Sequence, residues 1–182
     1  MPLRGAHIWP LSVAAYRALG ESGLIPKNTE LLYGFVYTKM SKSPFHSYLV
    51  QLLQDALAKT VPAGMTVRTE QPVTCGDSEP EPDIAVVSGR TEDFRHDHPH
   101  TAELVIEVCI SSHDFDRSKL HAYATAGVKE CWLVLGPEKQ IEVHTRPEGE
   151  RFAAKSVHGP HGRLVSVALP SFSVQMDSLF AK

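Results

Sequence analysis

The sequence has no excess of basic residues and no long apolar run. Its 182 residues include 18 Lys and Arg against 21 Asp and Glu, which gives a formal net charge of -3. A chain with this balance lacks the overall positive field that attracts nucleic acid, so contact with phosphates would need a local basic patch or metal ions. No apolar run approaches the roughly 18 residues that a membrane span requires, and the first residues lack the apolar core of a secretory signal. These absences predict a cytoplasmic protein without membrane contacts.

Cysteine is also scarce. The three cysteines, Cys75, Cys109 and Cys131, form no CxxC pair, and their odd number argues against a disulfide framework. Cys109 and Cys131 lie in apolar runs, which predicts buried free thiols. With 42% hydrophobic residues and no repeat or low-complexity linker, the chain suits one domain that covers residues 1–182.

The hydrophobic pattern predicts an α/β fold with a mixed sheet. The expected helices cover residues 13–19, 44–61 and 115–126, with a short closing helix near Asp177. The expected strands are a hairpin within 29–40, then 65–74, 83–87, 102–110, 131–135, a second hairpin of 141–145 and 151–157, and an edge strand at 163–168. The most hydrophobic strand, 102–110, should be central, and the helix-bridged step from it to 131–135 should be parallel.

Two acidic residues stand in apolar surroundings. Asp83 begins one apolar run, and Glu107 lies inside the predicted central strand. A carboxylate in a strand buried on both faces is costly unless it is paired or binds a cation. If the two strands are neighbours, the carboxylates meet, and a bound Mg²⁺ or Mn²⁺ would relieve their repulsion. The alternative is a structural ion pair of Glu107 with Lys119 or Lys129.

Lys119 lies near the start of the helix predicted at 115–126. The helix dipole disfavours a cation in a first turn, so this position makes sense if the side chain reaches an anion beyond the helix. The alternative is an ordinary solvated lysine on the surface.

Three segments together resemble a known family. EPDIAVV, AELVIEV and KLHAYATAGVKECWLV are similar to the Uma-type restriction endonuclease family of the PD-(D/E)XK nuclease superfamily. In that family one strand begins with Pro-Asp, the next central strand carries Glu-Val, and a Lys-Leu-x-x-Tyr helix leads into Gly-Val-x-Glu. The resemblance covers about residues 28–180 and includes the Glu-Leu-x-x-Gly hairpin that runs from Glu30 to Gly34.

The resemblance implies a restriction-endonuclease-like core, with a mixed central β-sheet flanked by helices, an additional N-terminal hairpin and C-terminal strands. It also implies a metal-dependent endonuclease that hydrolyses DNA. Asp83 and Glu107 would hold Mg²⁺, for which Mn²⁺ can substitute, and Lys119 would orient the nucleophile and stabilise phosphate charge. The superfamily's usual lysine position, two residues after the glutamate, is Cys109, which supplies no positive charge.

The sequence also offers secondary site residues and alternative functions. His46 and Glu70 are secondary candidates for phosphate or metal contacts, and each also has a purely structural reading. His96, His98 and His100 alternate in one polar loop and could bind Zn²⁺ or Ni²⁺ instead. A catalytically inactive binding or regulatory module with the same fold is the main alternative function. Nucleases of this type commonly pair, so a homodimer is expected.

Overall fold

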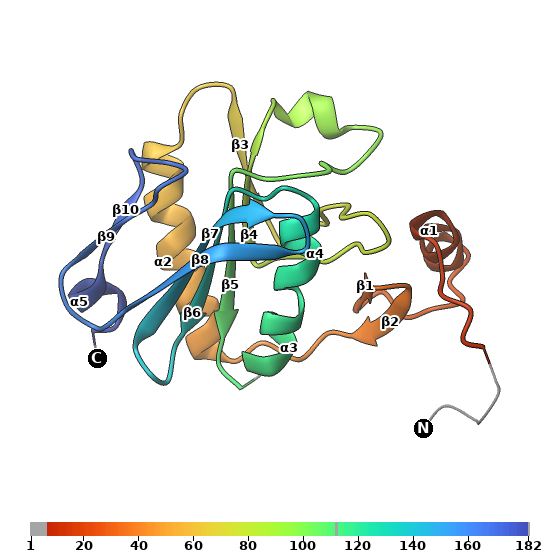
Figure 1. The fold of residues 1–182 in the computed structure, drawn as a ribbon, viewed down its shortest axis with the longest axis horizontal. Helices are drawn as coiled ribbons and strands as arrows, with labels where there is room; N and C mark the ends of the chain where they lie inside the picture. Colours follow the sequence, from red (N-terminus) through yellow and green to blue (C-terminus); the bar gives the residue numbers. More distant parts are fainter. Residues whose placement is uncertain (1–6, 112, 182) are drawn as a thin grey trace.

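A six-stranded mixed sheet forms the centre of the protein. The computed structural model describes residues 7–111 and 113–181, and the strands of the sheet lie in the order β3-β4-β5-β6-β7-β8 (Figure 1). They are β3 (Met65–Thr69), β4 (Ile84–Ser88), β5 (Leu104–Cys109), β6 (Glu130–Leu135), β7 (Gln140–Glu148) and β8 (Arg151–His158). β5 and β6 run parallel, and the other neighbouring pairs are antiparallel. The predicted α/β fold, mixed sheet and parallel step are therefore confirmed.

Helices cover both faces of this sheet (Figure 1). On one face α2 (Pro44–Thr60) packs Leu49, Leu53 and Leu57 into the same core as residues of β5 and β6. On the other face lie α3 (His113–Ser118) and α4 (Leu120–Thr125). Each fully buried large apolar side chain stabilises the fold by about 1.5–3 kcal/mol relative to exposure. Strand β5 is buried along its whole length, as its composition predicts.

Smaller elements extend the core at both ends of the chain. The N-terminal additions are α1 (Val13–Glu21) and the hairpin of β1 (Thr29–Leu32) and β2 (Phe35–Thr38). The later additions are a 3-10 helix (Thr91–Phe94), β9 (Arg163–Val165), β10 (Ser173–Gln175) and α5 (Met176–Leu179). The N-terminal hairpin and closing helix agree with the sequence prediction.

Three predicted elements differ from the structure. The strand expected at 65–74 ends at Thr69, because Glu70 takes a left-handed φ of 54° and Pro72 has no amide to donate. The strand expected at 163–168 pairs with β10 in a separate two-stranded sheet instead of joining the edge of the main sheet. The helix expected at 115–126 is divided into α3 and α4 at Lys119, whose amide bonds the carbonyl three residues back rather than four.

Two further observations concern the thiols and the possibility of a membrane-spanning helix. Cys109 and Cys131 are buried free thiols, as expected, and Cys75 is a buried free thiol as well. Within residues 7–111 and 113–181, no helix combines the length and the apolar character needed to cross a bilayer.

Candidate active site

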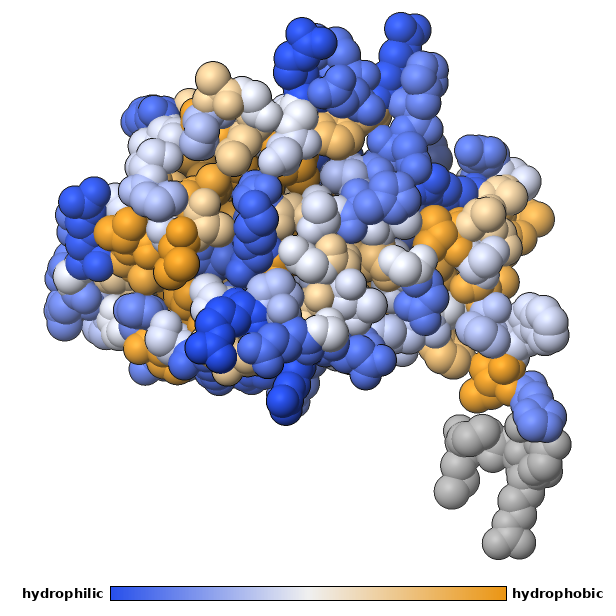
Figure 2. Space-filling view, turned by 45° about the horizontal axis from the view of Figure 1, so that its top comes forward, coloured by the Kyte–Doolittle hydropathy of each residue, from blue (hydrophilic) through white to orange (hydrophobic). Residues whose placement is uncertain are grey.

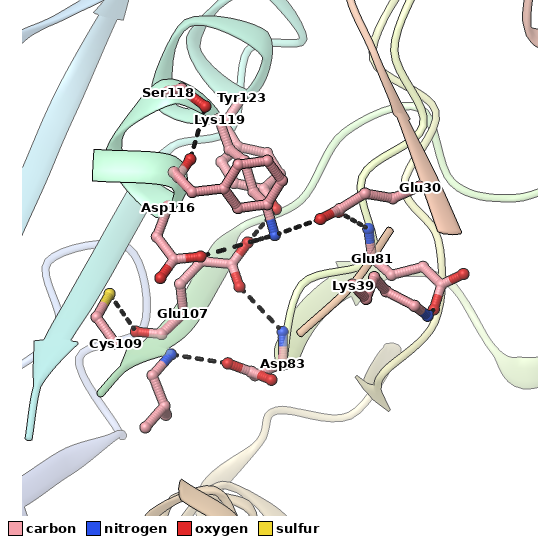
Figure 3. Close-up of polar contacts among 12 residues, drawn as sticks. Glu30, Lys39, Glu81, Asp83, Glu107, Cys109, Asp116, Ser118, Lys119 and Tyr123 are labelled. Carbon is pink, nitrogen blue, oxygen red and sulfur yellow. Dashed lines mark hydrogen bonds and ion pairs between the residues drawn. The ribbon is translucent and has the colours of Figure 1, made fainter. Parts of the chain in front are cut away.

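Asp83, directly before β4, lies beside Glu107 on the neighbouring strand β5, as the sequence predicts (Figure 3). The amide of Val108 donates to Asp83 Oδ2 at 2.8 Å, and the amide of Asp83 donates to Glu107 Oε2 at 3.4 Å. Each carboxylate therefore accepts a backbone hydrogen bond from the strand that carries the other. Because β4 and β5 are locked in register by their own ladder, the two carboxylates are held together by the sheet itself.

Lys119 extends from the junction of α3 and α4 into a group of carboxylates (Figure 3). Its buried Nζ lies 3.1 Å from Glu30 Oε1, 3.3 Å from Glu107 Oε1 and 3.9 Å from Asp116 Oδ1. Burial alone would lower the pKa of Lys119, but these carboxylates raise it above its ordinary value, so the ammonium stays charged. Lys129 pairs with Glu103 instead. The geometry thus contains the predicted Glu107–Lys119 ion pair and excludes a solvated Lys119.

The carboxyl group of Glu107 is crowded by burial and by other acids. Burial is the largest cause of its raised pKa of about 8; Lys119 lowers this pKa, and neighbouring carboxylates, Asp83 foremost, raise it. Tyr123 donates its hydroxyl hydrogen to Glu107 Oε1 at 2.6 Å. A fixed carboxyl group in such surroundings favours either a proton or an additional cation.

Asp83 has a different environment from Glu107. Burial would raise its pKa, but the hydrogen bond with His46 Nε2, at 3.1 Å from Oδ2, and the amide of Val108 hold the pKa below its ordinary value. Lys42 Nζ lies 3.7 Å from Asp83 Oδ1 and 2.5 Å from Glu70 Oε1. The structure therefore brings both secondary candidates, His46 and Glu70, to the Asp83 side of the site.

The ionisable side chains of this site line one pocket with an excess of acids. Its ionisable lining residues are six acids, three lysines and one histidine: Glu30, Glu70, Glu81, Asp83, Glu107, Asp116, Lys39, Lys42, Lys119 and His46. With a neutral histidine, six acids against three lysines leave a formal charge of -3. Such a pocket attracts cations from solution.

The side chains available as ligands fit Mg²⁺ better than they fit a metal ion that takes all of its ligands from the protein. Among the described residues no group of three or more His, Cys, Asp or Glu side chains is arranged to hold a metal ion. Mg²⁺ is usually bound through one or two carboxylates, with waters and substrate phosphates as its other ligands. Asp83 and Glu107 could supply those carboxylates. His46 contacts Asp83 through Nε2, and its buried Nδ1 has no hydrogen-bond partner among the described residues.

Sequence reasoning missed four residues of this cluster. Glu30 carried a usable signal, because it is a single acid beside the apolar pair Leu31 and Leu32, and it is buried. Tyr123 lies in the helix motif that carries the resemblance, but nothing in the motif assigns it a bond to Glu107. Asp116 and Lys42 gave no signal, since charged residues in a polar segment ordinarily face solvent.

Two further sequence features are the His-rich loop and Cys109. In the His-rich loop, His98 Nδ1 lies 3.2 Å from Arg68 Nη2, whereas His100 Nε2 lies 3.0 Å from Asp97 Oδ2. These histidines have different partners, which gives the Zn²⁺ or Ni²⁺ reading no support. Cys109 is buried, and burial raises the pKa of its thiol, so it stays neutral and leaves the positive charge to Lys119.

Comparison with solved structures assigns the fold to a class. A search found the same architecture in "a putative nuclease belonging to DUF820 from Anabaena variabilis ATCC 29413", with a TM-score of 0.76 and 19% sequence identity. The match covers 94% of this chain and 98% of that chain. The protein therefore has an α/β fold shared with a nuclease-fold protein.

The family follows from a comparison of sequences. A family model described as "Putative restriction endonuclease", Uma2, matches residues 24–177. The match spans most of the 182 residues, and the chain belongs to the Uma2 family. A search of curated proteins gave no match.

Proposed function

We propose that the protein is a metal-dependent endonuclease that hydrolyses phosphodiester bonds of DNA. The observation that carries this proposal is the buried pair of Asp83 and Glu107, fixed by cross-strand hydrogen bonds and faced by the charged ammonium of Lys119. Membership of the Uma2 family supports DNA as the substrate.

Each group has a distinct role in this proposal. Asp83 and Glu107 would hold Mg²⁺, and Mn²⁺ could replace it. When bound, the ion polarises the scissile phosphate and lowers the pKa of the attacking water. Lys119 stabilises the negative charge that develops on the phosphate. His46 orients Asp83 through their hydrogen bond, and Glu70, which Lys42 links to Asp83, would be a further carboxylate on that side of the ion.

The net charge of the chain shapes how DNA is bound. At -3 the chain as a whole repels phosphates, so the bound cation and the lysines of the pocket must supply most of the local attraction. A homodimer would present two such sites to one duplex, and we include a dimer and a cytoplasmic location in the proposal.

A catalytically inactive binding or regulatory module is the second candidate. The observation that favours it is the number of acids already bound to Lys119, which are Glu30, Glu107 and Asp116. A lysine neutralised in this way stabilises the fold without reaching a substrate. The two candidates predict the same metal binding and differ in hydrolysis.

The test combines calorimetry with cleavage. Mn²⁺ is titrated into wild type, Glu107→Gln and His98→Ala, and supercoiled plasmid is incubated with each protein in Mg²⁺ or Mn²⁺. We expect wild type and His98→Ala to bind Mn²⁺ and nick the plasmid. Glu107→Gln should lose at least about tenfold in affinity, because one of two charged ligands is gone, and should not nick.

The outcomes separate the candidates. Metal binding that depends on Glu107 without any cleavage supports the inactive module. Absence of Mn²⁺ binding in wild type overturns the enzyme proposal and leaves Glu107 as a structural ion-pair partner of Lys119.

A further inference from the structure

Lys42 is the lysine that contacts the Asp83 side of the pocket. It lies in the loop between β2 and α2, with 37% of its side chain exposed, and bridges Glu70 Oε1 at 2.5 Å and Asp83 Oδ1 at 3.7 Å. Asp83 Oδ2 is already bonded to His46 and to the amide of Val108. The remaining oxygen, Oδ1, is therefore the one most open to a cation, and Lys42 is beside it.

The backbone of Glu70 is arranged for this bridge. Glu70 has a left-handed φ of 54°, a conformation that costs a non-glycine residue about 1 kcal/mol or more and persists only where its surroundings impose it. Its amide donates to the carbonyl of Asp83 at 3.1 Å, which ties the end of β3 to the start of β4. The two carboxylates that Lys42 bridges are thus held next to each other by the backbone.

The other two lysines of the pocket are bound differently. Lys119 is buried among Glu30, Glu107 and Asp116. Lys39 pairs with Glu81. A partly exposed lysine on a loop can move at little cost, because its long side chain has many rotamers and water can solvate its ammonium. Lys42 is therefore a cation that sits at the candidate metal ligands and is free to leave them.

We propose that Lys42 serves as an exchangeable cation of the site: it neutralises Asp83 and Glu70 in the metal-free protein, and after metal loading it contacts a phosphate of the nucleic-acid substrate. This inference rests on the proposed function, since it takes Asp83 as a metal ligand. Displacement by a divalent ion leaves the ammonium at the pocket mouth, where the nearest new anion is the substrate backbone. Metal loading and substrate binding are then coupled through one side chain.

The test uses charge-removing and charge-keeping variants with a matched control. Mn²⁺ is titrated by calorimetry into wild type, Lys42→Gln, Lys42→Arg and Lys39→Gln. Lys42→Gln should bind Mn²⁺ about tenfold more tightly, which is the order of effect of removing a unit charge about 4 Å away in partly solvated surroundings. Lys42→Arg should resemble wild type. Lys39→Gln, which removes a charge from the same wall of the pocket but not from Asp83, should change the affinity for Mn²⁺ by less than about twofold.

A second measurement follows the substrate. A fluorescein-labelled DNA duplex is titrated with wild type and Lys42→Gln, in Ca²⁺ and in chelator. Lys42→Gln should weaken binding in Ca²⁺, because the released ammonium is missing, and should leave binding in chelator unchanged, because Lys42 is then held by the acids.

The outcomes distinguish this inference from the function on which it rests. Equal or weaker Mn²⁺ binding by Lys42→Gln, with binding by wild type intact, overturns the inference alone. Mn²⁺ binding by neither protein overturns the metal site and the inference together. Mn²⁺ binding by Lys42→Gln but not by wild type overturns the enzyme proposal and, with it, this inference.

Discussion

The carboxyl group of Glu107 is buried, and burial favours its protonated form. The free energy of unfolding should therefore depend on pH. The pKa of Glu107 is raised to about 8 in the folded protein, against 4.5 for an ordinary glutamate. The native state then holds more protons than the unfolded state, so stability falls as the pH rises through the folded pKa. Between about pH 7 and about pH 9 we expect the metal-free protein to lose about 1 kcal/mol of unfolding free energy from this group. Urea denaturation in chelator measures the loss.

The matched control is Glu107→Gln. Asp83, whose pKa is lowered, is ionised in both the folded and unfolded states across this range. Cys75, whose pKa burial raises to about 12, contributes in the same direction in both proteins. The variant should therefore show a shallower decline than wild type, and equal declines would contradict the pKa assigned to Glu107.

At the scale of elements, the N-terminus of α2 positions His46. Ser43 Oγ accepts a hydrogen bond from the His46 amide at 3.1 Å, and Ser12 Oγ accepts one from Ala15 at the start of α1. Loss of an N-cap costs about 1 kcal/mol when the helix must stay formed. Ser43→Ala should lower the unfolding free energy by about this amount, because α2 buries four apolar residues. Urea denaturation followed by circular dichroism measures the change.

Ser12→Ala is the comparison. None of the nine described residues of α1 is buried, so this helix can fray at its first turn without exposing the core. We expect a change below about 0.5 kcal/mol. A loss as large as that of Ser43→Ala would show that α1 is coupled to the core more tightly than its contacts indicate.

Part of the fold and of the site could be predicted from the sequence, because an ionisable residue within an apolar run is unusual and apolar runs mark buried strands. A carboxylate inside an apolar strand is expensive, which identified Glu107, and the apolar run of β5 identified the central strand. Lys42 and Asp116 are ordinary on a surface, and their position at the site arises from tertiary contacts alone. The left-handed Glu70 is likewise unpredictable, because its residue type favours other conformations.

At the scale of the whole molecule, Figure 2 shows apolar surface at both ends, one of which carries α1 and the N-terminal hairpin. Trp9 is 91% exposed and Leu24 is 72% exposed there. Exposed apolar surface often marks an interface. We expect a homodimer through this end, and Trp9→Ser with Leu24→Ser should shift it toward monomer. Size-exclusion chromatography with light scattering gives the mass.

Val167 provides the control for the dimer. It is 72% exposed in the segment after β9, which Figure 1 places far from α1. Val167→Ser should leave the mass unchanged. A monomeric wild type would refute the dimer, and a dimer lost only in Val167→Ser would move the interface to the C-terminal end.

The negative and positive charges of the site come from different kinds of segment. Asp83 and Glu107 are set by paired strands, whereas Lys119 lies at a helix junction and Lys42 in a loop. The strands that carry the carboxylates are therefore separate from the segments that carry the lysines. Under the proposed function, hydrolysis could therefore be lost by a change in a helix junction or loop while the strands keep the carboxylates, so cutting and non-cutting relatives should share one architecture and differ first in their lysines.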